Sequence, residues 1–154
     1  MVMDTIDKKI LNIVQDDSRK SSAEIATAVG VSVSTANERV RKLTASGHIK
    51  AWQAVLSSEK VGSNLCAFLL LDMDYAGEAH ACAALVKLDE VQELHHISGA
   101  HSYMMKIRVA NTKALQRLIS TKIKPLAGIT GTQSMLVLST EKETPKMLVG
   151  ESGK

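Results

Sequence analysis

The stretch from Ser21 to Lys50, SSAEIATAVGVSVSTANERVRKLTASGHIK, predicts two short helices joined by a tight turn. Ser21 and Glu24 have the spacing of a capping box, in which a hydroxyl and a carboxylate accept from free amides at a helix start. Gly30 permits a positive φ and predicts the end of the first helix. Ser32 is a favourable N-cap for the second helix.

The second of these helices has one apolar side and one polar side. Ala36, Val40 and Leu43 recur at helical spacing and are expected to face a core, and Gly47 ends the run. The opposite side begins with short polar side chains and continues with basic ones, which is the layout of a helix that reads bases and contacts phosphates. The residues predicted to contact DNA are Ser22, Ser32, Ser34, Thr35, Asn37, Glu38, Arg41 and Lys42.

Two other interpretations of this region remain open. The segment from Arg39 to Lys50 carries four Lys or Arg and no acid, which also suits an ordinary helical hairpin with a basic exposed face. Arg39 itself could brace the domain through Asp7 or Glu24 instead of facing DNA.

A further helix is predicted before this pair, with Asp4 as its cap and an apolar face that includes Ile10. The three helices form a helix-turn-helix DNA-binding domain over residues 1–50. Apolar and polar residues alternate from His48 to Val55, which predicts a strand, and a polar linker follows, so that residues 51–63 contain strand and linker.

The second half of the chain has a different pattern. Apolar or alternating segments at 65–73, 91–98, 103–109 and 130–138 predict strands, and segments at 77–86 and 112–123 predict helices, the latter capped by Thr112. The order βαββαβ is that of a ferredoxin-like domain over residues 64–140, so the fold class is α+β. Helices on one side leave the other face of the sheet open, which predicts at least a homodimer. Residues 141–154 are a polar C-terminal tail, expected to be loosely held.

Composition narrows the class of protein. Hydrophobic residues make up 45% of the 154 positions, which is enough for a folded core, and the net charge is +3. Aromatic residues make up only 3%, whereas proteins that bind RNA or single strands stack bases on aromatic rings, so double-stranded DNA is the expected partner. There is no signal-peptide pattern and no apolar run long enough for a membrane. Cys66 and Cys82 suggest reduced thiols, so a cytoplasmic protein is expected.

No motif indicates catalysis. HExxH, GxSxG and P-loop spacings are absent from the sequence, and the adjacent His95 and His96 would point to opposite faces of a strand. We therefore expect no enzyme activity, no metal site and no cofactor.

Several short motifs, in this order and spacing, resemble the Lrp/AsnC family of leucine-responsive and asparagine-responsive transcription regulators. They are Ile6–Leu11, Glu24–Ala26, Val29–Ser34, Arg39–Leu43, Gly47–Lys50, Ile97–Gly99 and Met135–Leu138. The resemblance implies that the second domain senses an amino acid. It also implies dimers that form through the sheets and assemble further, often into an octamer, with the effector bound between dimers near the loop after the second strand.

That loop departs from the leucine-responsive branch of the family, which typically has an Asp at the position of Ser102, and is closer to the asparagine-responsive branch. The resemblance therefore implies asparagine or another small polar amino acid as effector, or binding that is altered or lost. The residues predicted to bind effector are Gly99, Ala100, His101, Ser102, Tyr103, Thr132 and Ser134. Ser102 could instead be a turn residue that satisfies its own backbone, and Ser134 a plain sheet residue.

Together these features predict a sequence-specific DNA-binding transcription regulator whose assembly and operator affinity respond to a small amino acid bound between dimers. The alternative is an architectural regulator that wraps DNA and has no small-molecule effector.

Overall fold

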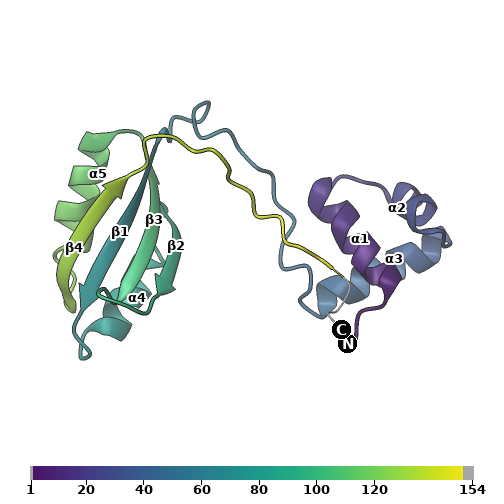
Figure 1. The fold of residues 1–154 in the computed structure, drawn as a ribbon, viewed down its shortest axis with the longest axis horizontal. Helices are drawn as coiled ribbons and strands as arrows, with labels where there is room; N and C mark the ends of the chain where they lie inside the picture. Colours follow the sequence, from purple (N-terminus) through teal and green to yellow (C-terminus); the bar gives the residue numbers. More distant parts are fainter. Residues whose placement is uncertain (1, 151–154) are drawn as a thin grey trace. The chain divides into compact units, whose positions relative to one another are not determined.

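The computed structural model describes residues 2–150, which divide into two compact units. One unit contains the chain up to Val55 together with the segment from Lys142 onward, and the other contains Leu56–Glu141 (Figure 1). The return of the C-terminal segment to the first unit differs from the loosely held tail expected from its composition, and its contacts are described below.

The first unit is a bundle of three helices, α1 (Thr5–Asp16), α2 (Ser22–Val29) and α3 (Val33–Ala45). Each begins at the predicted cap, and both Asp4 with Asp7 and Ser21 with Glu24 form complete capping boxes. Gly30 ends α2 with a φ of 75°, as predicted. The buried core consists of Ile10, Val14, Ile25, Ala26, Ala36, Leu43 and Ile49.

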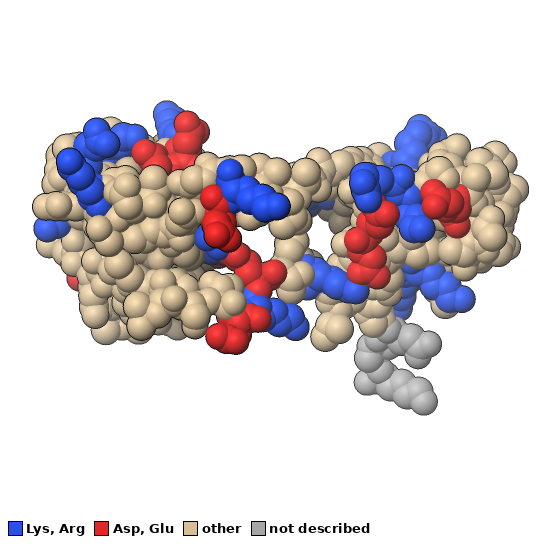
Figure 2. Space-filling view, turned by 90° about the horizontal axis from the view of Figure 1, so that it is seen from above, with Lys and Arg blue, Asp and Glu red and all other residues tan. Residues whose placement is uncertain are grey.

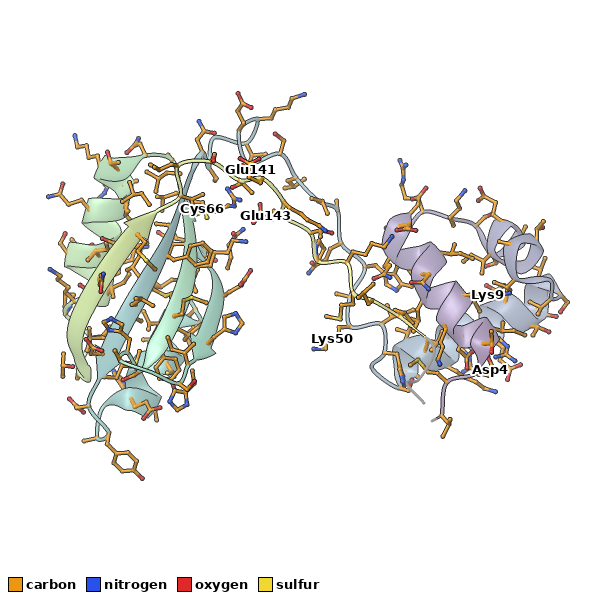
Figure 3. The ribbon with its side chains drawn as sticks, in the orientation of Figure 1. Asp4, Lys9, Lys50, Cys66, Glu141 and Glu143 are labelled. Atoms are coloured by element: carbon orange, nitrogen blue, oxygen red, sulfur yellow. The ribbon has the colours of Figure 1, made fainter. Side chains whose placement is uncertain are left out.

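A charged cluster fastens α3 to the start of α1. The Arg39 guanidinium donates to Asp4 Oδ2 and to Asp7 Oδ1, each at 2.7 Å, and Figure 3 shows Asp4 at this end of α1. Asp7 is only 6% exposed, so its charge depends on this partner and on the Asp4 amide, which donates to its other oxygen. The sequence suggested Asp7 and Glu24 as possible partners of Arg39, and Arg39 pairs with Asp7.

The second unit has the predicted βαββαβ order. Its elements are β1 (Leu65–Met73), α4 (Glu78–Leu85), β2 (Val91–His96), β3 (Tyr103–Val109), α5 (Thr112–Leu118) with a π-helical turn (Ile119–Ile123), and β4 (Ile129–Leu136). The sheet is antiparallel with strand order β2-β3-β1-β4, the ferredoxin-like arrangement.

Alternation along the strands gives the sheet two different faces. Leu69 and Leu71 of β1 lie in register with Met105 and Tyr103 of β3, and they pack with the helices in one core. The remaining buried members of that core are Ala67, Leu85, Ile107, Val109, Leu115, Leu118 and Ile123. The intervening residues Phe68 and Leu70 face the other way and are only partly buried. That second face is called the open face below.

Two glycines bring the start of α4 against the chain that leads into β4. A Cβ at Gly77 would lie 2.3 Å from the Gly128 Cα, and one at Gly128 would lie 2.5 Å from the Gly77 carbonyl carbon. The Gly128 carbonyl accepts from the Asp74 amide across the same contact. No larger residue fits at either position, so this contact fixes where β4 begins.

Two predicted elements are wrong in detail. The strand from His48 to Val55 is absent from the described chain, because no neighbouring strand is present to satisfy its backbone; Ile49 instead joins the core of the first unit, and Val55 is exposed. Thr112 is not the cap of α5. Asn111 is, since its side-chain oxygen accepts from the Ala114 amide.

The cap of α2 makes stability depend on pH. Hydrogen bonds from the Ser21 amide and hydroxyl, helped by Lys20, lower the pKa of Glu24 from 4.5 to about 2. A depressed pKa stabilises the fold above the unfolded value and loses that effect as pH falls from about 4.5 to about 2. We expect Glu24→Gln to lower the melting temperature at neutral pH and to match the parent near pH 2.

Urea denaturation of both chains across this pH range measures the effect, with Glu59→Gln, at an exposed linker position, as the matched control. A Glu24→Gln deficit that stayed constant with pH would contradict the ionic part of the cap.

Candidate nucleic-acid interface and ligand site

The outermost stripe of α3 consists of Ser34, Asn37 and Arg41, which follow i, i+3, i+7 spacing and are all exposed. The Ser22 hydroxyl of α2 donates to Asn37 Oδ1. This contact orients the Asn37 amide, and its two N–H groups remain for an outside acceptor. Four of the predicted DNA-contacting residues therefore form one exposed patch across α2 and α3.

A second stripe on α3, Thr35, Glu38 and Lys42, is partly engaged within the domain. Lys42 Nζ lies 2.7 Å from Glu38 Oε1, and this hydrogen bond, more than any other cause, lowers the pKa of Glu38. Figure 2 shows red Asp and Glu side chains beside blue Lys and Arg side chains on the visible face of the molecule, which is not limited to α3. The basic character of α3 is thus lower than its Lys and Arg content suggests, because Arg39 and Lys42 are both paired.

The predicted residue Ser32 has a structural role. Its hydroxyl accepts from the Thr35 amide as the cap of α3 and lies 2.8 Å from the Thr35 hydroxyl and 2.9 Å from the Ser34 hydroxyl. Thr35 is half-buried and borders a small pocket of about 260 Å³ beside Asp7 and Arg39. These hydroxyls fix the first turn of α3.

In the second unit, the predicted effector loop Gly99–Tyr103 joins β2 to β3. The Ser102 amide donates to the Leu71 carbonyl, and the Ser102 hydroxyl accepts from the Met73 amide at 3.3 Å. Ser102 therefore satisfies the backbone of the neighbouring strand β1 and not its own backbone, and its hydroxyl proton remains available to donate. Gly99 has a φ of 126°, a backbone conformation that favours glycine, and a Cβ at this position would meet no neighbouring atom. Glycine is therefore required here by the backbone conformation and not by the close approach of another segment.

Tyr103 is directed toward α4. Its hydroxyl donates to Glu78 Oε1 at 2.6 Å, and its ring stacks on His96 with centroids 4.8 Å apart. The neighbouring Glu78, followed by Cys82, raises the pKa of Tyr103 well above its usual range. The side chain thus anchors one end of the loop.

The sequence interpretation missed Asp72, the acid near the end of the long apolar strand. His101 Nδ1 lies 3.0 Å from Asp72 Oδ1, so this carboxylate is held directly against the loop. The other oxygen, Oδ2, lies where a Cβ at Gly131 would be only 2.6 Å away. The loop therefore has a carboxylate beside it, although Ser102 occupies the position where an Asp was expected.

Thr132 and Ser134 lie elsewhere, in a groove of about 550 Å³ between α5 and the edge strand β4. Its polar lining also includes Gln116, Ser120 and Lys124, and its apolar lining is Leu115, Ile119 and Leu136. An ammonium group, an amide and hydroxyls around an apolar patch can bind the carboxylate and side chain of a small amino acid. No pattern in the sequence placed Lys124 and Gln116 beside β4; the fold of α5 over the sheet does so.

The two predicted parts of the effector site do not line a common pocket in one chain. Leu71 is fully buried between them, in register with Tyr103 on one side and with Thr132 on the other. None of the loop residues lines the groove. The loop and the groove are therefore two separate surfaces of one chain.

The described residues 2–150 contain no cluster of His, Cys, Asp or Glu suited to a metal ion. Within the same range, no helix has the length and apolarity needed to cross a membrane.

Comparison with known families identifies both units. Residues 3–50 match the winged helix-turn-helix DNA-binding model, and residues 66–147 match the Lrp/AsnC ligand binding domain.

Full-length relatives and solved structures agree with these matches. The chain is 34% identical over 148 residues to the HTH-type transcriptional regulator FL11 of Pyrococcus furiosus, covering 96% of this chain and 97% of that protein. It is 31% identical over 150 residues to the leucine-responsive regulatory protein of Salmonella typhimurium, covering 96% and 92%.

Among solved structures, Escherichia coli AsnC superposes with a TM-score of 0.88 at 27% identity, covering 97% of this chain and 100% of that one. A Neisseria meningitidis transcriptional regulator in complex with L-methionine superposes with a TM-score of 0.91 at 25% identity, covering 96% and 97%. The chain, with a helix-turn-helix domain followed by a ligand-binding domain, belongs to the Lrp/AsnC family of transcription regulators.

Proposed function

We propose that this regulator reads DNA with the exposed patch of Ser22, Ser34, Asn37 and Arg41. The supporting observation is the contact of Asn37 with Ser22, because Ser22 engages the amide oxygen and leaves the amide N–H groups to donate to another acceptor. Such a donor pair suits acceptors on base edges in the major groove. Arg41 lies one turn further along the same stripe, where a guanidinium meets phosphate. Thr35, Glu38 and Lys42 flank the patch, and Ser32 holds the first turn.

Two substitutions are expected to separate base reading from phosphate binding. Arg41→Ala should weaken binding to every duplex and reduce the slope of log K against log salt by about 0.9 for each DNA-binding unit that contacts the duplex. Asn37→Ala should cost about 1–3 kcal/mol on the preferred site and little on random duplex. Fluorescence anisotropy across a salt series measures both, with Lys87→Ala, an exposed cation of the second unit, as control.

A substitution that is expected to strengthen DNA binding tests the ion pair between Lys42 and Glu38 on the second stripe. Glu38→Gln removes an acid and releases Lys42, so binding to all duplexes should strengthen. Parent-like affinity in both Arg41→Ala and Glu38→Gln would show that α3 does not meet the phosphate backbone.

For the second unit, we propose that the α5–β4 groove of one chain and the Gly99–Tyr103 loop of another together bind an amino acid. Lys124 would pair with the effector carboxylate, and Gln116 and Ser134 would contact its side chain. Asp72, held beside the loop by His101, would accept from the ammonium. Support comes from the separation of the two parts within one chain, since a shared ligand then requires an interface.

The lining favours a small effector with a polar side chain, asparagine first. Gln116, Ser120, Thr132 and Ser134 offer both donors and acceptors, and a site built to pair an amide rejects apolar analogues because its polar atoms would stay unpaired. Methionine is the second candidate, because the Neisseria meningitidis relative is solved with L-methionine and the groove has an apolar side.

Thermal shift with each of the twenty amino acids tests this site. A true effector at about 100 times its Kd should stabilise the protein by about 2.7 kcal/mol. Lys124→Ala and Ser134→Ala should abolish most of that shift, whereas Lys113→Ala, on α5 but outside the groove lining, should retain it. If none of the twenty shifts the melting temperature at millimolar concentration, the architectural role without effector becomes the better account.

We also propose that copies of the chain pair through the open face and that dimers assemble further, as an octamer of four dimers. Phe68 and Leu70 lie on this face beside Met104 and Met135, which continue the apolar surface onto the neighbouring strands. Lys106 lies opposite Phe68 and is paired with Glu93 of β2, so two copies could bury the apolar side chains beside a charge that is already balanced within each chain.

Leu70→Asp should therefore dissociate the dimer, because an unpaired carboxylate in the interface centre costs far more than it does in water. Sedimentation velocity at micromolar concentration measures the mass, with Lys113→Asp on the helical side as control. A Leu70→Asp chain that kept the parent's mass would place the interface elsewhere.

A further inference from the structure

The C-terminal segment lies along one side of α1 as an extended chain. Its contacts fall on Asn12, Gln15 and Asp16, which form one helical stripe by i, i+3, i+4 spacing. The segment belongs to the same compact unit as α1, and its last described residues lie close to this helix (Figure 1). We call this stripe the α1 stripe.

Gln15 provides the central contact. Its Nε2 donates to the Met147 carbonyl at 2.9 Å, and its Oε1 accepts from the Met147 amide at 3.0 Å. One side-chain amide thus pairs with both backbone groups of a single residue, as a neighbouring strand would. Gln15 Nε2 also donates to Asn12 Oδ1, and Asn12 Nδ2 donates to the Val149 carbonyl at 3.3 Å.

The docked segment is held by hydrogen bonds to its main chain and not by the burial of apolar side chains. Met147 is 72% exposed and Leu148 is fully exposed, so little apolar surface is buried. An ion pair between Lys146 and Asp16 adds charge complementarity, although both groups are about half exposed and the pair is screened. A few such bonds would hold a free peptide weakly. A segment joined to the same chain has an effective concentration in the millimolar range, and this makes the docking favourable yet reversible.

We propose that the α1 stripe is a receptor surface for the chain's own segment Lys146–Val149, and that the docked tail is a second tether on the DNA-binding unit. The linker after Val55 is the first connection between the units. The tail is the second, because it follows β4, which ends at Leu136, and its described part reaches α1 through Met147 and Val149. Two tethers restrict the orientations of the DNA-binding unit more than one does.

The tail begins at the end of β4, a strand that lines the α5–β4 groove, so the tether could respond to a ligand bound in that groove. Thr132, Ser134 and Leu136 of the groove lie on β4, and the Val137 amide, the first after the strand, still pairs with the Cys66 carbonyl. A ligand that shifts the end of β4 would therefore change the length of tail available to α1. This consequence rests on the proposed effector site, whereas the docking does not.

Hydrogen exchange at the Met147 amide in the full chain tests the docking. We expect this amide to be protected in the parent and to exchange roughly tenfold faster in Gln15→Ala, because its acceptor is lost. Thr5→Ala, an exposed position at the other end of α1, should leave the protection unchanged. Intact protection of the α1 backbone in both variants shows that the helix itself has not unfolded.

A double-mutant cycle with Met147→Pro, which removes the amide donor, distinguishes the tail from any other partner of Gln15. If Gln15 acts through the tail, Gln15→Ala should not change the melting temperature further once Pro is present. Additive effects, or an unprotected Met147 amide in the parent, would overturn the docking.

Nitrogen relaxation of the first unit tests the tether. Its motion should become more independent of the second unit in both Gln15→Ala and Met147→Pro. Identical relaxation in parent and variants would overturn the tether, and this result is independent of whether any amino acid binds in the α5–β4 groove.

Discussion

The alternation of side chains along β1 is the constraint on which the second unit depends. Because β1 is a central strand, its residues 67, 69 and 71 must be apolar to pack under α4 and α5, and Phe68 and Leu70 necessarily face the opposite side. A shift of one residue would exchange the buried and open faces. Asp72 is the last residue but one of the same strand, so the register that forms the core also places a carboxylate beside the Gly99–Tyr103 loop.

In the first unit, the basic side chains of α3 lie in two different environments, one inside the domain and one on its surface. Arg39 and Arg41 are two residues apart, yet Arg39 is committed to the nearly buried Asp7 and Arg41 is exposed on the outer stripe. An unpaired carboxylate at Asp7 would be costly, and this explains why one basic side chain of α3 is directed inward. The basic surface that α3 exposes is therefore narrower than the run of Lys and Arg suggests. It is also better defined, since Ser22 holds Asn37 in one orientation.

In the ligand-binding unit, Leu71 fills the core between the Gly99–Tyr103 loop and Thr132, so the two parts proposed to bind effector are separate within one chain. Binding between copies would couple ligand occupancy to assembly, and by linkage assembly would respond to ligand with an equal free energy. The C-terminal tail supplies a physical route by which the same event could reach α1.

Sequence alone determined the helices of the first unit, their caps and the order of elements in the second, because caps and apolar periodicity are local properties. It also predicted that Ser34, Asn37 and Arg41 share one exposed face of α3, since side chains at i, i+3 and i+7 share a face in any helix. Only the tertiary structure decided the partner of Arg39, the place of Asp72 beside His101, and the groove that joins Lys124 to Ser134. These contacts join residues far apart in the chain. The alternating pattern of His48–Val55 wrongly predicted a strand, because a strand forms only when a neighbouring strand completes its hydrogen bonds. The polar composition of the tail wrongly predicted a loosely held segment, because its main chain forms hydrogen bonds with α1.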